Sequence, residues 1–524
     1  MSRSLRLTLA AATLAALAAA PTAQAKFVYG VAAGEIAPSG AKIWTRAMKA
    51  GPVDVELGTS RAALRRVAGV TARTSRDLTL TVSLRRLKPD TKYFYAFRQG
   101  AVRSTVGTFR TAPRPTSTKT IRFAWSGDAD AQPLKPGDPP FWNRFEIYGQ
   151  MAKESNAFNI NLGDTIYSDT EVGSTVENGN FQPSAPVART VAEKRAKYQQ
   201  NLREAALQRL RAGAGLYSHW DDHEFINDFS KAEEGTAIYA AGRTAFTDYA
   251  PVTYTARDGL YRSFRWGRNL EVFFLDERSF RSAKAGANHV CDNPQTGQPD
   301  LAPTAPPDKR ALFALVAPSL AQPVSPQCLA TINDPNRTML GSRQYQRFTT
   351  AIKASKATFK VIMNEVPIQQ FYALPYDRWE GYEAERQKLL GYLKANVKNV
   401  IFLTTDVHAN LVNDARLKTF EAGGPVDSGI IDVTTGPVAT KSFSKEIDSA
   451  TGSQGSGDLV AKAFFKPAPP NGTGMTCAAV DVFSYGQVEV TKSRLTVRLK
   501  DATGKPVVDT GTGQPCAPIV VNRK

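Results

Sequence analysis

The sequence predicts a mixed α/β protein in which a small antiparallel β-sandwich precedes a larger α/β domain. Short apolar runs separated by turn residues fill the first hundred residues, a pattern typical of antiparallel strands. From residue 120 onward, apolar runs of strand length alternate with helical patterns, which indicates an α/β or layered α/β/α core. The chain of 524 residues is too long for one simple core, and its 42% hydrophobic and 22% charged residues are typical of folded globular proteins.

The first 25 residues have the pattern of a secretory signal peptide. Arg3 and Arg6 precede an apolar run from residue 7 to residue 20, and the small residues Ala23 and Ala25 form a cleavage site. The run is too short to cross a bilayer, and the sequence contains no longer apolar segment. We therefore expect an exported protein, located in the periplasm, in the cell envelope or outside the cell.

The β-sandwich is predicted for residues 26–112, and residues 113–120 are predicted to form a linker. Strands are expected at residues 41–45, 53–57, 78–82 and 93–97. These runs either alternate between apolar and polar residues or are apolar throughout, and turn residues lie between them. Several short strands within so short a stretch are typical of a sandwich.

The α/β domain is predicted for residues 121–524. Strands are expected at residues 121–125, 158–162, 216–217, 270–275, 359–363 and 400–403, and helices at residues 142–153, 191–210, 342–356 and 382–395. Residues 283–340 are rich in proline and contain two cysteines, which indicates a disulfide-pinned surface excursion rather than a separate domain. A hairpin at residues 485–490 and 494–499 is expected to complete a sheet of this domain.

The chain contains four cysteines, an even number that suits disulfides in an exported protein. Of the three ways to pair them, proximity in the sequence favours Cys291 with Cys328 and Cys477 with Cys516. None lies in a C-x-x-C pair, so a thiolate zinc site is not expected.

The formal net charge is +18, which attracts anions such as phosphate esters, nucleic acids and anionic lipids. The positive residues are scattered, and the sequence contains no dense Lys/Arg block with interleaved aromatic residues. A solvated basic surface is therefore favoured over a dedicated nucleic-acid groove.

Polar and charged side chains follow six predicted strands, at the point where each strand ends. They are Asp128 and Asp130, Asp164, the run Asp221-Asp222-His223-Glu224, Asp276 with Arg278, Asn364 with Glu365, and Asp406 with His408. In an α/β sheet, consecutive strand ends can converge on one face, where ligands bind. So many acids brought together would repel one another and acquire raised pKa values unless cations neutralised them. The sequence therefore predicts a site for two or more metal ions.

The residue types limit which metals and roles are expected. Carboxylate oxygens favour Ca²⁺, Mg²⁺ or Mn²⁺, whereas histidine and tyrosine suit iron or zinc. Asp164, with Tyr167 three residues later, has the position of a bridging ligand; the alternative is a turn aspartate beside a packed tyrosine. The run at residues 221–224 is the strongest local signal of a metal site; the alternative is that it caps a helix. For Asp406 and His408, the alternative is a capping aspartate beside a core histidine.

Several further residues are expected to support the ligands or to contact the substrate: Asp221, Asn227, Asp276 and Asn364. Arg278 has the geometry to bind phosphate through two hydrogen bonds, although an ion pair with Asp276 explains it equally well. His219 is expected to be packed or to support the site from behind, and His289 is expected to lie on the surface.

At these motifs the sequence strongly resembles the PhoD-type alkaline phosphatases, a branch of the calcineurin-like metallophosphoesterases. The matching segments are residues 161–167, 220–228, 275–280 and 403–408, together with residues 377–382 and 434–437. With the β-rich N-terminal region, the resemblance covers nearly all of the mature chain.

The resemblance implies a four-layer α/β/β/α metallophosphoesterase core, a fibronectin-like N-terminal domain, export, and hydrolysis of small phosphate esters with Fe³⁺ and Ca²⁺. By matched position, Asp164 would bridge the metals and Tyr167 would bind the ferric ion. Asp406 and His408 would complete the metal site. Asp222 occupies the place of a metal-binding asparagine in related enzymes, and His223 that of a histidine that binds phosphate or donates a proton.

Two positions depart from the family pattern. Asp128 stands where the best-known members have a cysteine whose thiolate binds iron, so a carboxylate replaces the thiolate here. The identity of the metal is therefore open, with Mn²⁺, Mg²⁺ and Zn²⁺ as alternatives. Thr405 replaces the glycine that usually precedes the last aspartate.

The sequence thus predicts an exported, metal-dependent phosphoesterase that attacks phosphorus directly with a metal-activated hydroxide. His223 would assist the leaving group and Arg278 would hold phosphate. One alternative is a phosphodiesterase or phospholipase D-like enzyme. Another is a non-catalytic envelope protein whose acids bind only structural calcium.

Overall fold

The computed structural model describes residues 26–177, 180–182, 185–315 and 317–524. The predicted signal peptide lies outside the described residues. Within them, no helix combines the length and apolar character needed to span a bilayer.

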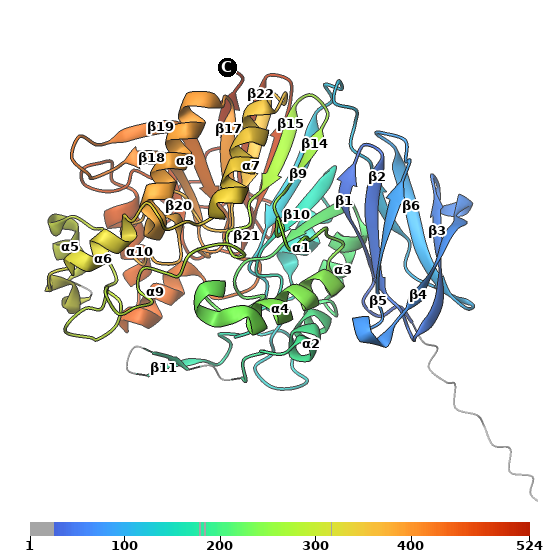
Figure 1. Ribbon diagram of the computed structural model, residues 1–524, viewed down its shortest axis with the longest axis horizontal. Coiled ribbons are helices and arrows are strands. Elements are labelled where there is room, and N and C mark those ends of the chain that lie inside the picture. The colour runs from blue at the N-terminus through green and yellow to red at the C-terminus, as the bar shows by residue number, and fades with distance from the viewer. Residues whose placement is uncertain (1–25, 178–179, 183–184, 316) are drawn as a thin grey trace, which may run out of the picture.

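The N-terminal region consists of two antiparallel sheets (Figure 1, blue). The first contains β1 (Val31–Ala37), β2 (Gly40–Arg46) and β5 (Thr79–Arg85), in the order β1-β2-β5. The second contains β4 (Arg65–Ala72), β3 (Gly51–Gly58) and β6 (Lys92–Gln99), with β7 (Val102–Arg103) and β8 (Gly107–Arg110) pairing with β6. Two 3₁₀ turns, η1 (Arg61–Ala63) and η2 (Thr74–Arg76), connect strands at opposite ends of β4. The predicted β-rich N-terminal region is confirmed.

Two larger sheets form the rest of the molecule. The first has the order β13 (Gly215–His219), β10 (Phe158–Leu162), β9 (Ile121–Ser126), β21 (Ser484–Val490), β22 (Arg494–Asp501) and β23 (Ile519–Asn522). The second has the order β14 (Arg262–Trp266), β15 (Leu270–Phe274), β16 (Phe359–Met363), β17 (Val400–Thr404), β19 (Val426–Thr434), β18 (Asn410–Lys418) and β20 (Cys477–Ala479). Strands β13, β10 and β9 are parallel, as are β15, β16, β17 and β19.

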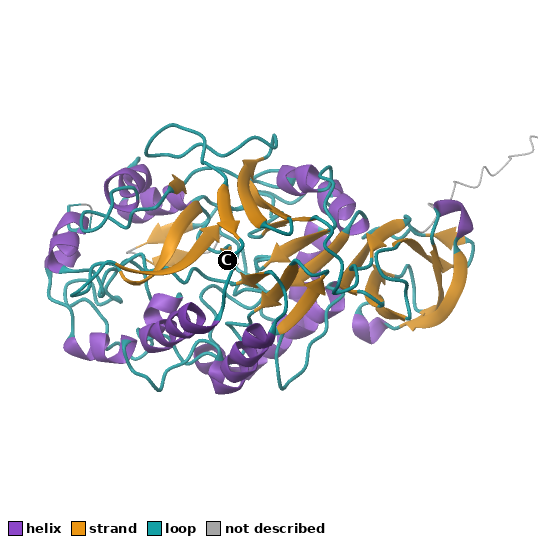
Figure 2. Cartoon of the chain, turned by 90° about the horizontal axis from the view of Figure 1, so that it is seen from above, coloured by secondary structure: helices purple, strands orange, loops and turns teal. Residues whose placement is uncertain are grey.

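The two sheets pack against each other through a shared apolar cluster. Phe123 and Ile160 of the first sheet belong to the same buried cluster as Val361 and Leu403 of the second. Helices α1 (Glu146–Met151), α2 (Val191–Asn201), α3 (Ala205–Ala212) and α4 (Lys231–Tyr249) contribute to a cluster with the other face of the first sheet. Helices α7 (Gly341–Ala354) and α8 (Glu383–Asn396) form another apolar cluster with the second sheet. Figure 2 shows strands at the centre and helices around them. The prediction of a mixed α/β fold is confirmed.

Two predicted helices differ from the structure. The helix expected at residues 142–153 covers only Glu146–Met151, because Phe145 at its start has a left-handed backbone with φ 59°. The helix expected at residues 191–210 is two helices. The first begins with a capping box between Thr190 and Glu193 and ends at Asn201, whose side-chain amide donates to the carbonyls of Ala129 and Thr165.

The predicted hairpin of β21 and β22 is present, and β21 pairs with β9 in the middle of the first sheet. The predicted excursion at residues 283–340 contains α5 (Pro307–Phe313), η3 (Pro318–Ala321) and α6 (Pro326–Ile332). The remaining elements are β11 (Thr175–Glu177), β12 (Asn180–Gln182), η4 (Trp379–Tyr382), α9 (Phe443–Thr451), α10 (Ser456–Val460) and η5 (Ala461–Phe465).

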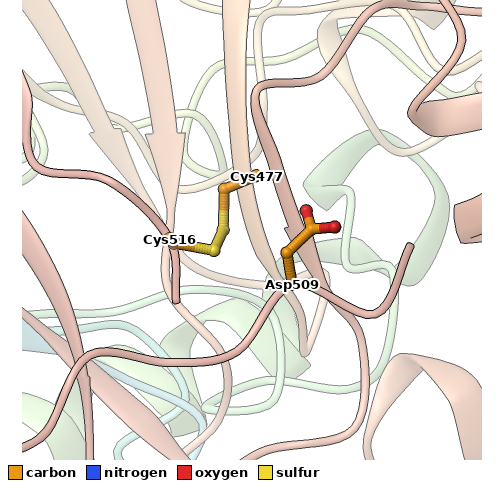
Figure 3. A group of neighbouring side chains, drawn as sticks. All are labelled: Cys477, Asp509 and Cys516. Carbon is orange, nitrogen blue, oxygen red and sulfur yellow. A yellow bond between two sulfur atoms is a disulfide. The ribbon is translucent and has the colours of Figure 1, made fainter. Parts of the chain in front are cut away.

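Both predicted disulfides are present. Cys291 pairs with Cys328 inside the excursion, and Cys477 of β20 pairs with Cys516 near the C-terminus. Asp509 lies beside the second disulfide (Figure 3). This group does not suit a metal ion, because the sulfurs are joined and the Asp509 carboxylate accepts from the Ala478 N–H at 2.7 Å and pairs with Lys466 at 3.0 Å.

Replacing Cys477 and Cys516 together by serine is expected to lower the free energy of unfolding by about 2–4 kcal/mol, because the bridge closes a long loop in the unfolded chain. The two cysteines are 39 residues apart. Urea unfolding followed by circular dichroism measures the change. An unfolding midpoint equal to that of the oxidised wild-type protein would contradict a stabilising role.

Candidate metal centre

The loops that follow β9, β10, β13 and β17 meet at one edge of the two sheets and bring together carboxylates from distant parts of the chain. Gly163 allows the approach of two of these loops. A Cβ atom at Gly163 would lie 2.5 Å from the Cβ of Asp221, and its φ of 80° is one that L side chains rarely adopt. The glycine therefore lets the loop carrying Asp164 contact the loop carrying Asp221 and Asp222.

Three overlapping groups of possible metal ligands result, in each of which the donor atoms lie within 4.8 Å of one another. The groups are Asp128, Asp164 and His408; Asp164, Asp222 and His223; and Asp221, Asp222 and Asp406. Asp164 belongs to the first two groups and Asp222 to the last two. The arrangement therefore suits more than one cation, with shared carboxylates between neighbouring positions.

The backbone is left-handed at four of these residues. The φ angles are 60° at Asp128, 46° at Asp164, 72° at Asp406 and 54° at His408. Aspartate and histidine adopt this conformation more readily than most residues, but each instance still costs about 1–3 kcal/mol. Strain concentrated at one cluster is typical of a functional site that the surrounding packing holds in place.

His408 is held between a tyrosine and a carboxylate. Its Nε2 lies 3.0 Å from the hydroxyl oxygen of Tyr167, and its Nδ1 lies 2.6 Å from the Glu446 carboxylate of α9. An Nδ1–H that donates to Glu446 leaves the Nε2 lone pair directed towards Tyr167 and the carboxylates. This is the usual arrangement of a histidine that binds a metal through one nitrogen.

His223 is oriented by Asp169, a residue for which the sequence predicted no role. The Nδ1 of His223 lies 2.6 Å from one oxygen of Asp169, and the other oxygen accepts from the backbone N–H of Asn227 at 2.7 Å. The buried Lys194 donates to Ser168 at 2.7 Å and to the carbonyl of Phe225 at 2.6 Å, so it joins the two loops. Burial lowers the pKa of His223, but the negative charges of Asp169, Asp222 and Asp164 raise it by more. The pKa of His223 therefore lies well above the usual value for histidine.

Arg278 is completely buried and lies in an ion-pair network. Its Nε donates to Asp221 at 2.5 Å and its Nη1 to both oxygens of Asp377 at 2.8 Å, while Arg281 donates to Asp377 at 2.6 Å. The expected alternative, an ion pair with Asp276, is wrong: the Arg278 side chain does not contact Asp276, which accepts from Arg278 only the backbone N–H, at 3.3 Å. The Nη2 of Arg278 has no hydrogen-bond partner among the described residues.

The donor set fits multivalent cations. Among the described residues, the buried atoms Asp128 Oδ2, Asp221 Oδ2 and Asp222 Oδ1 have no hydrogen-bond partner. Burial raises the pKa of Asp128 to about 6 and raises the pKa values of Asp164 and Asp221 well above their usual range. Buried, unpaired and mutually repelling carboxylates are costly unless positive charge neutralises them.

Three predicted residues do not point into the cluster. The side chain of Asn227 is exposed. Asp276 is occupied by the backbone N–H of Leu260 at 2.7 Å and by Ser279, and Asn364 is bonded to Val366 and Trp379. The side chains of Asp276 and Asn364 stabilise the turns after β15 and β16, which is the ordinary role of aspartate and asparagine at strand ends.

The other two histidines lie where the sequence predicted. His219 is fully buried, with its Nε2 2.5 Å from the carbonyl of Leu275. His289 is exposed beside Asp292.

Sequence reasoning missed four residues of the site, namely Asp169, Asp228, Asp377 and Glu446. Asp228 and Asp377 form a further group with Asp222. Asp228 and Asp377 lie within the motif segments 220–228 and 377–382, and Asp169 lies two residues after the segment 161–167. This closeness to the motifs is the only signal that the sequence gives for them. Glu446 lies on a helix far along the chain and had none.

Comparison with known proteins places this chain among phosphatases. A sequence model of the PhoD-like phosphatases matches residues 139–499, and one of the N-terminal domain of PhoD-like phosphatases matches residues 11–113. Alkaline phosphatase D of Bacillus subtilis (strain 168) is 26% identical over 350 residues, which cover 62% of this chain and 52% of that protein. The match thus spans about half the length of that relative.

Two solved structures share the fold. The structure of PhoD superposes with a TM-score of 0.72 at 21% identity and covers 97% of this chain and 92% of its own. A purple acid phosphatase from seeds of yellow lupin (Lupinus luteus) superposes with a TM-score of 0.56 at 13% identity. The superposition covers 95% of this chain and 74% of the lupin chain. At these identities the likeness shows the fold alone.

Proposed function

This chain belongs to the PhoD-like phosphatase family, and from that premise we propose that it is a metal-dependent phosphoesterase that hydrolyses small phosphate esters. The observation that carries the proposal is the position of Asp164, which takes part in two adjoining groups of possible metal ligands. Carboxylates shared in this way are typical of two-metal sites that act on phosphate esters.

Asp128, Asp164, Tyr167 and His408 would hold one cation. Asp222, Asp406 and the shared Asp164 would hold a second, with Asp221 beside them. Bound cations would polarise phosphoryl oxygens and lower the pKa of water. Fe³⁺ and Ca²⁺ follow from the family resemblance, and the carboxylate of Asp128 in place of a thiolate keeps Mn²⁺, Mg²⁺ and Zn²⁺ as alternatives.

Arg278 would position the phosphate. Its Nε and Nη1 are fixed by Asp221 and Asp377, and the free Nη2 lies 3.8 Å from Asp406, a proposed metal ligand. A guanidinium held rigidly on one side offers a charge-assisted hydrogen bond on the other. Asp377 acts through Arg278 and is therefore a positioning residue.

His223 would donate a proton to the oxygen of the leaving group. The carboxylates around it raise its pKa well above the usual value, which favours the protonated ring. A protonated imidazole is the usual general acid for such a step.

Replacing Asp169 by asparagine is expected to lower kcat by about 10²-fold, a typical share for proton transfer. Because Asp169 raises the pKa of His223, its loss moves the alkaline limb of the pH–rate profile to lower pH. Stopped assays with p-nitrophenyl phosphate across pH 6–11 measure the shift. Asp292→Asn, which removes a similar contact to the exposed His289, is the control and should leave the profile unchanged. An unchanged alkaline limb in Asp169→Asn would refute the role of Asp169.

We propose a domain organisation of signal peptide (1–25), fibronectin-like sandwich (26–112), linker (113–120) and four-layer α/β/β/α catalytic domain (121–524). Export is supported by the residue pattern of the first 25 positions and by the two disulfides, which form in oxidising compartments.

Metal analysis tests the proposal. Purified protein is expected to contain at least two multivalent cations per chain, and a chelator is expected to abolish hydrolysis and lower the melting temperature, because the carboxylates then repel one another. Calcium alone, with no hydrolysis of any ester at alkaline pH, would instead indicate a non-catalytic calcium-binding protein. Faster hydrolysis of bis-p-nitrophenyl phosphate than of p-nitrophenyl phosphate would indicate a phosphodiesterase or phospholipase D-like enzyme.

A further inference from the structure

Positive charge is unevenly distributed along the chain. Residues 26–112 contain 16 Lys and Arg but only 5 Asp and Glu, a net charge of +11. Residues 113–524 contain 48 Lys and Arg and 43 Asp and Glu, a net charge of only +5. A small β-rich region therefore carries most of the net positive charge of the described protein. Such an asymmetry indicates an anionic partner.

Six exposed cations of this region that form no ion pair lie at one end of its sheets. They are Arg61, Arg65, Arg85, Arg86, Lys88 and Lys92, which we call the basic end. All six are exposed, and among the described residues none has a carboxylate within ion-pair distance. Arg46, Arg66, Arg98 and Arg103 are neutralised by Asp77, Asp54 and Glu56. Lys26, Lys49 and Arg73 also form no ion pair among the described residues, but Lys49 and Arg73 lie at the opposite end of β3 and β4.

Strand register brings the six together. Leu57 near the end of β3 pairs with Arg65 on one side and Tyr95 on the other, so the starts of β4 and β6 flank the end of β3. The charged groups of Arg61 and Lys92 lie 5.7 Å and 5.3 Å from the centre of the Phe94 ring.

The loop from β5 to β6 supplies the other three cations. Arg85 ends β5, and the backbone N–H of Lys88 donates to the hydroxyl of Tyr93 at 2.9 Å, beside Lys92. The connections β3–β4 and β5–β6 thus present all six cations at the same end.

The positive surface continues into a groove next to the linker. Lys92 pairs in register with Arg110, and Arg110 lies with Lys119 and Arg122 in a groove of about 620 Å³ bounded by Trp266 of the second large sheet. The side chains of these three cations are 46%, 65% and 53% exposed. Arg110 and Lys119 share Asp90, and Arg122 pairs with Glu489, so three cations face two carboxylates there. The basic end and the groove therefore form one continuous cationic track.

The chemistry of the track favours a chain of phosphates over other anions. Single-stranded nucleic acids need free aromatic faces for stacking, but Phe94 is covered by Arg61 and Lys92, and Tyr93 is buried. Membrane insertion needs exposed large apolar residues, and in the described part of this region only Val28 and Val67 are exposed. Several unpaired arginines and lysines in a row suit repeating phosphate groups.

We infer that the basic end and the adjoining groove are a binding site for a linear phosphate polymer, separate from the metal centre. The site would hold the enzyme on a polymeric anion while the metal centre acts on its own substrate. The inference concerns binding and does not require the proposed hydrolytic activity.

The test uses the full-length protein and inorganic polyphosphate of about 100 phosphates as the probe. Wild-type protein is expected to bind it with an affinity that falls steeply as salt increases, because each phosphate contact releases a counterion. The variant Arg65→Glu/Arg85→Glu/Lys88→Glu is expected to bind at least about 30-fold more weakly, with a log–log salt slope smaller by about three. Fluorescence anisotropy or calorimetry measures both quantities.

The matched control is Lys388→Glu/Lys394→Glu/Lys462→Glu, which makes the same charge change at exposed residues of α8 and η5. It should lose less than about 3-fold in affinity. Hydrolysis of p-nitrophenyl phosphate should be equal in wild type and both variants. A loss of hydrolysis is therefore distinguished from a loss of polyphosphate binding. Equal losses in the two triple variants would overturn the inference. Tighter, track-dependent binding of a single-stranded oligonucleotide or of anionic vesicles would overturn it as well.

Discussion

Replacing Asp164 by asparagine is expected to lower kcat/KM for p-nitrophenyl phosphate by at least about 10³-fold, the size of effect seen when a key electrostatic group is lost. Asp164 takes part in two of the three ligand groups, so its loss affects both proposed cations at once. An amide presents one neutral oxygen where the carboxylate presents two charged ones, and it cannot bridge in the same way.

The protein should remain folded after this change. The Asp164 side chain accepts one hydrogen bond, from the backbone N–H of His223 at 3.2 Å, and an asparagine oxygen can accept it equally. Burial raises the pKa of Asp164, so a neutral side chain relieves repulsion in metal-free protein. The melting temperature without metal should therefore be equal to or above that of wild type.

Elemental analysis and circular dichroism complete the experiment. Asp164→Asn should retain fewer cations per chain, and added metal should raise its melting temperature less than it raises that of the wild type. Asp138→Asn, at an exposed aspartate, is the control. Near wild-type activity in Asp164→Asn would exclude the proposed bridging role.

Replacing Arg278 by methionine is expected to lower the free energy of unfolding by about 3–5 kcal/mol, because it leaves buried carboxylates without their partner. Arg278 is fully buried and contacts Asp221 and Asp377 directly. Activity should be lost as well, since the free Nη2 is removed. Urea unfolding at neutral pH measures the change in stability.

Two comparisons make this result specific. Arg66→Met removes an exposed ion pair with Asp54 and should cost less than about 1 kcal/mol. Arg278→Lys keeps the charge but cannot contact both carboxylates as a planar group, so it should fold better than Arg278→Met while remaining poorly active. If Arg278→Met proved as stable as Arg66→Met, the network would be unimportant for folding.

The fold was predictable where strands are buried on both faces. Residues 158–162, 359–363 and 400–404 are short, mainly apolar runs, and each is a completely buried strand. Strand β4 was missed because its residues are mostly exposed and include Arg65 and Arg66, so it lacks an apolar alternation. The break between α2 and α3 was missed because it depends on Asn201 reaching Ala129 and Thr165, contacts that exist only in the folded chain.

The site was predictable to the extent that it lies directly at strand ends. Asp128, Asp164 and Asp406 each follow a parallel strand within a few residues, and they converge as expected. Asp377 lies in a long loop after β16, where sequence position gives no direction. Asp276 shows the opposite error, because a strand-end aspartate was expected to serve the site and instead bonds to nearby backbone groups.

The position of β21 has a consequence for biosynthesis. This strand comes from the last tenth of the polypeptide, yet it pairs with β9, which leads to Asp128 near the start of the α/β region. A chain emerging from a ribosome therefore has β10 available on one side of β9 early, but lacks β21 on the other side until almost all of the chain has been delivered. If the chain is exported as proposed, the acidic cluster would assemble only after translocation and would meet its cations in the destination compartment rather than at the place of synthesis.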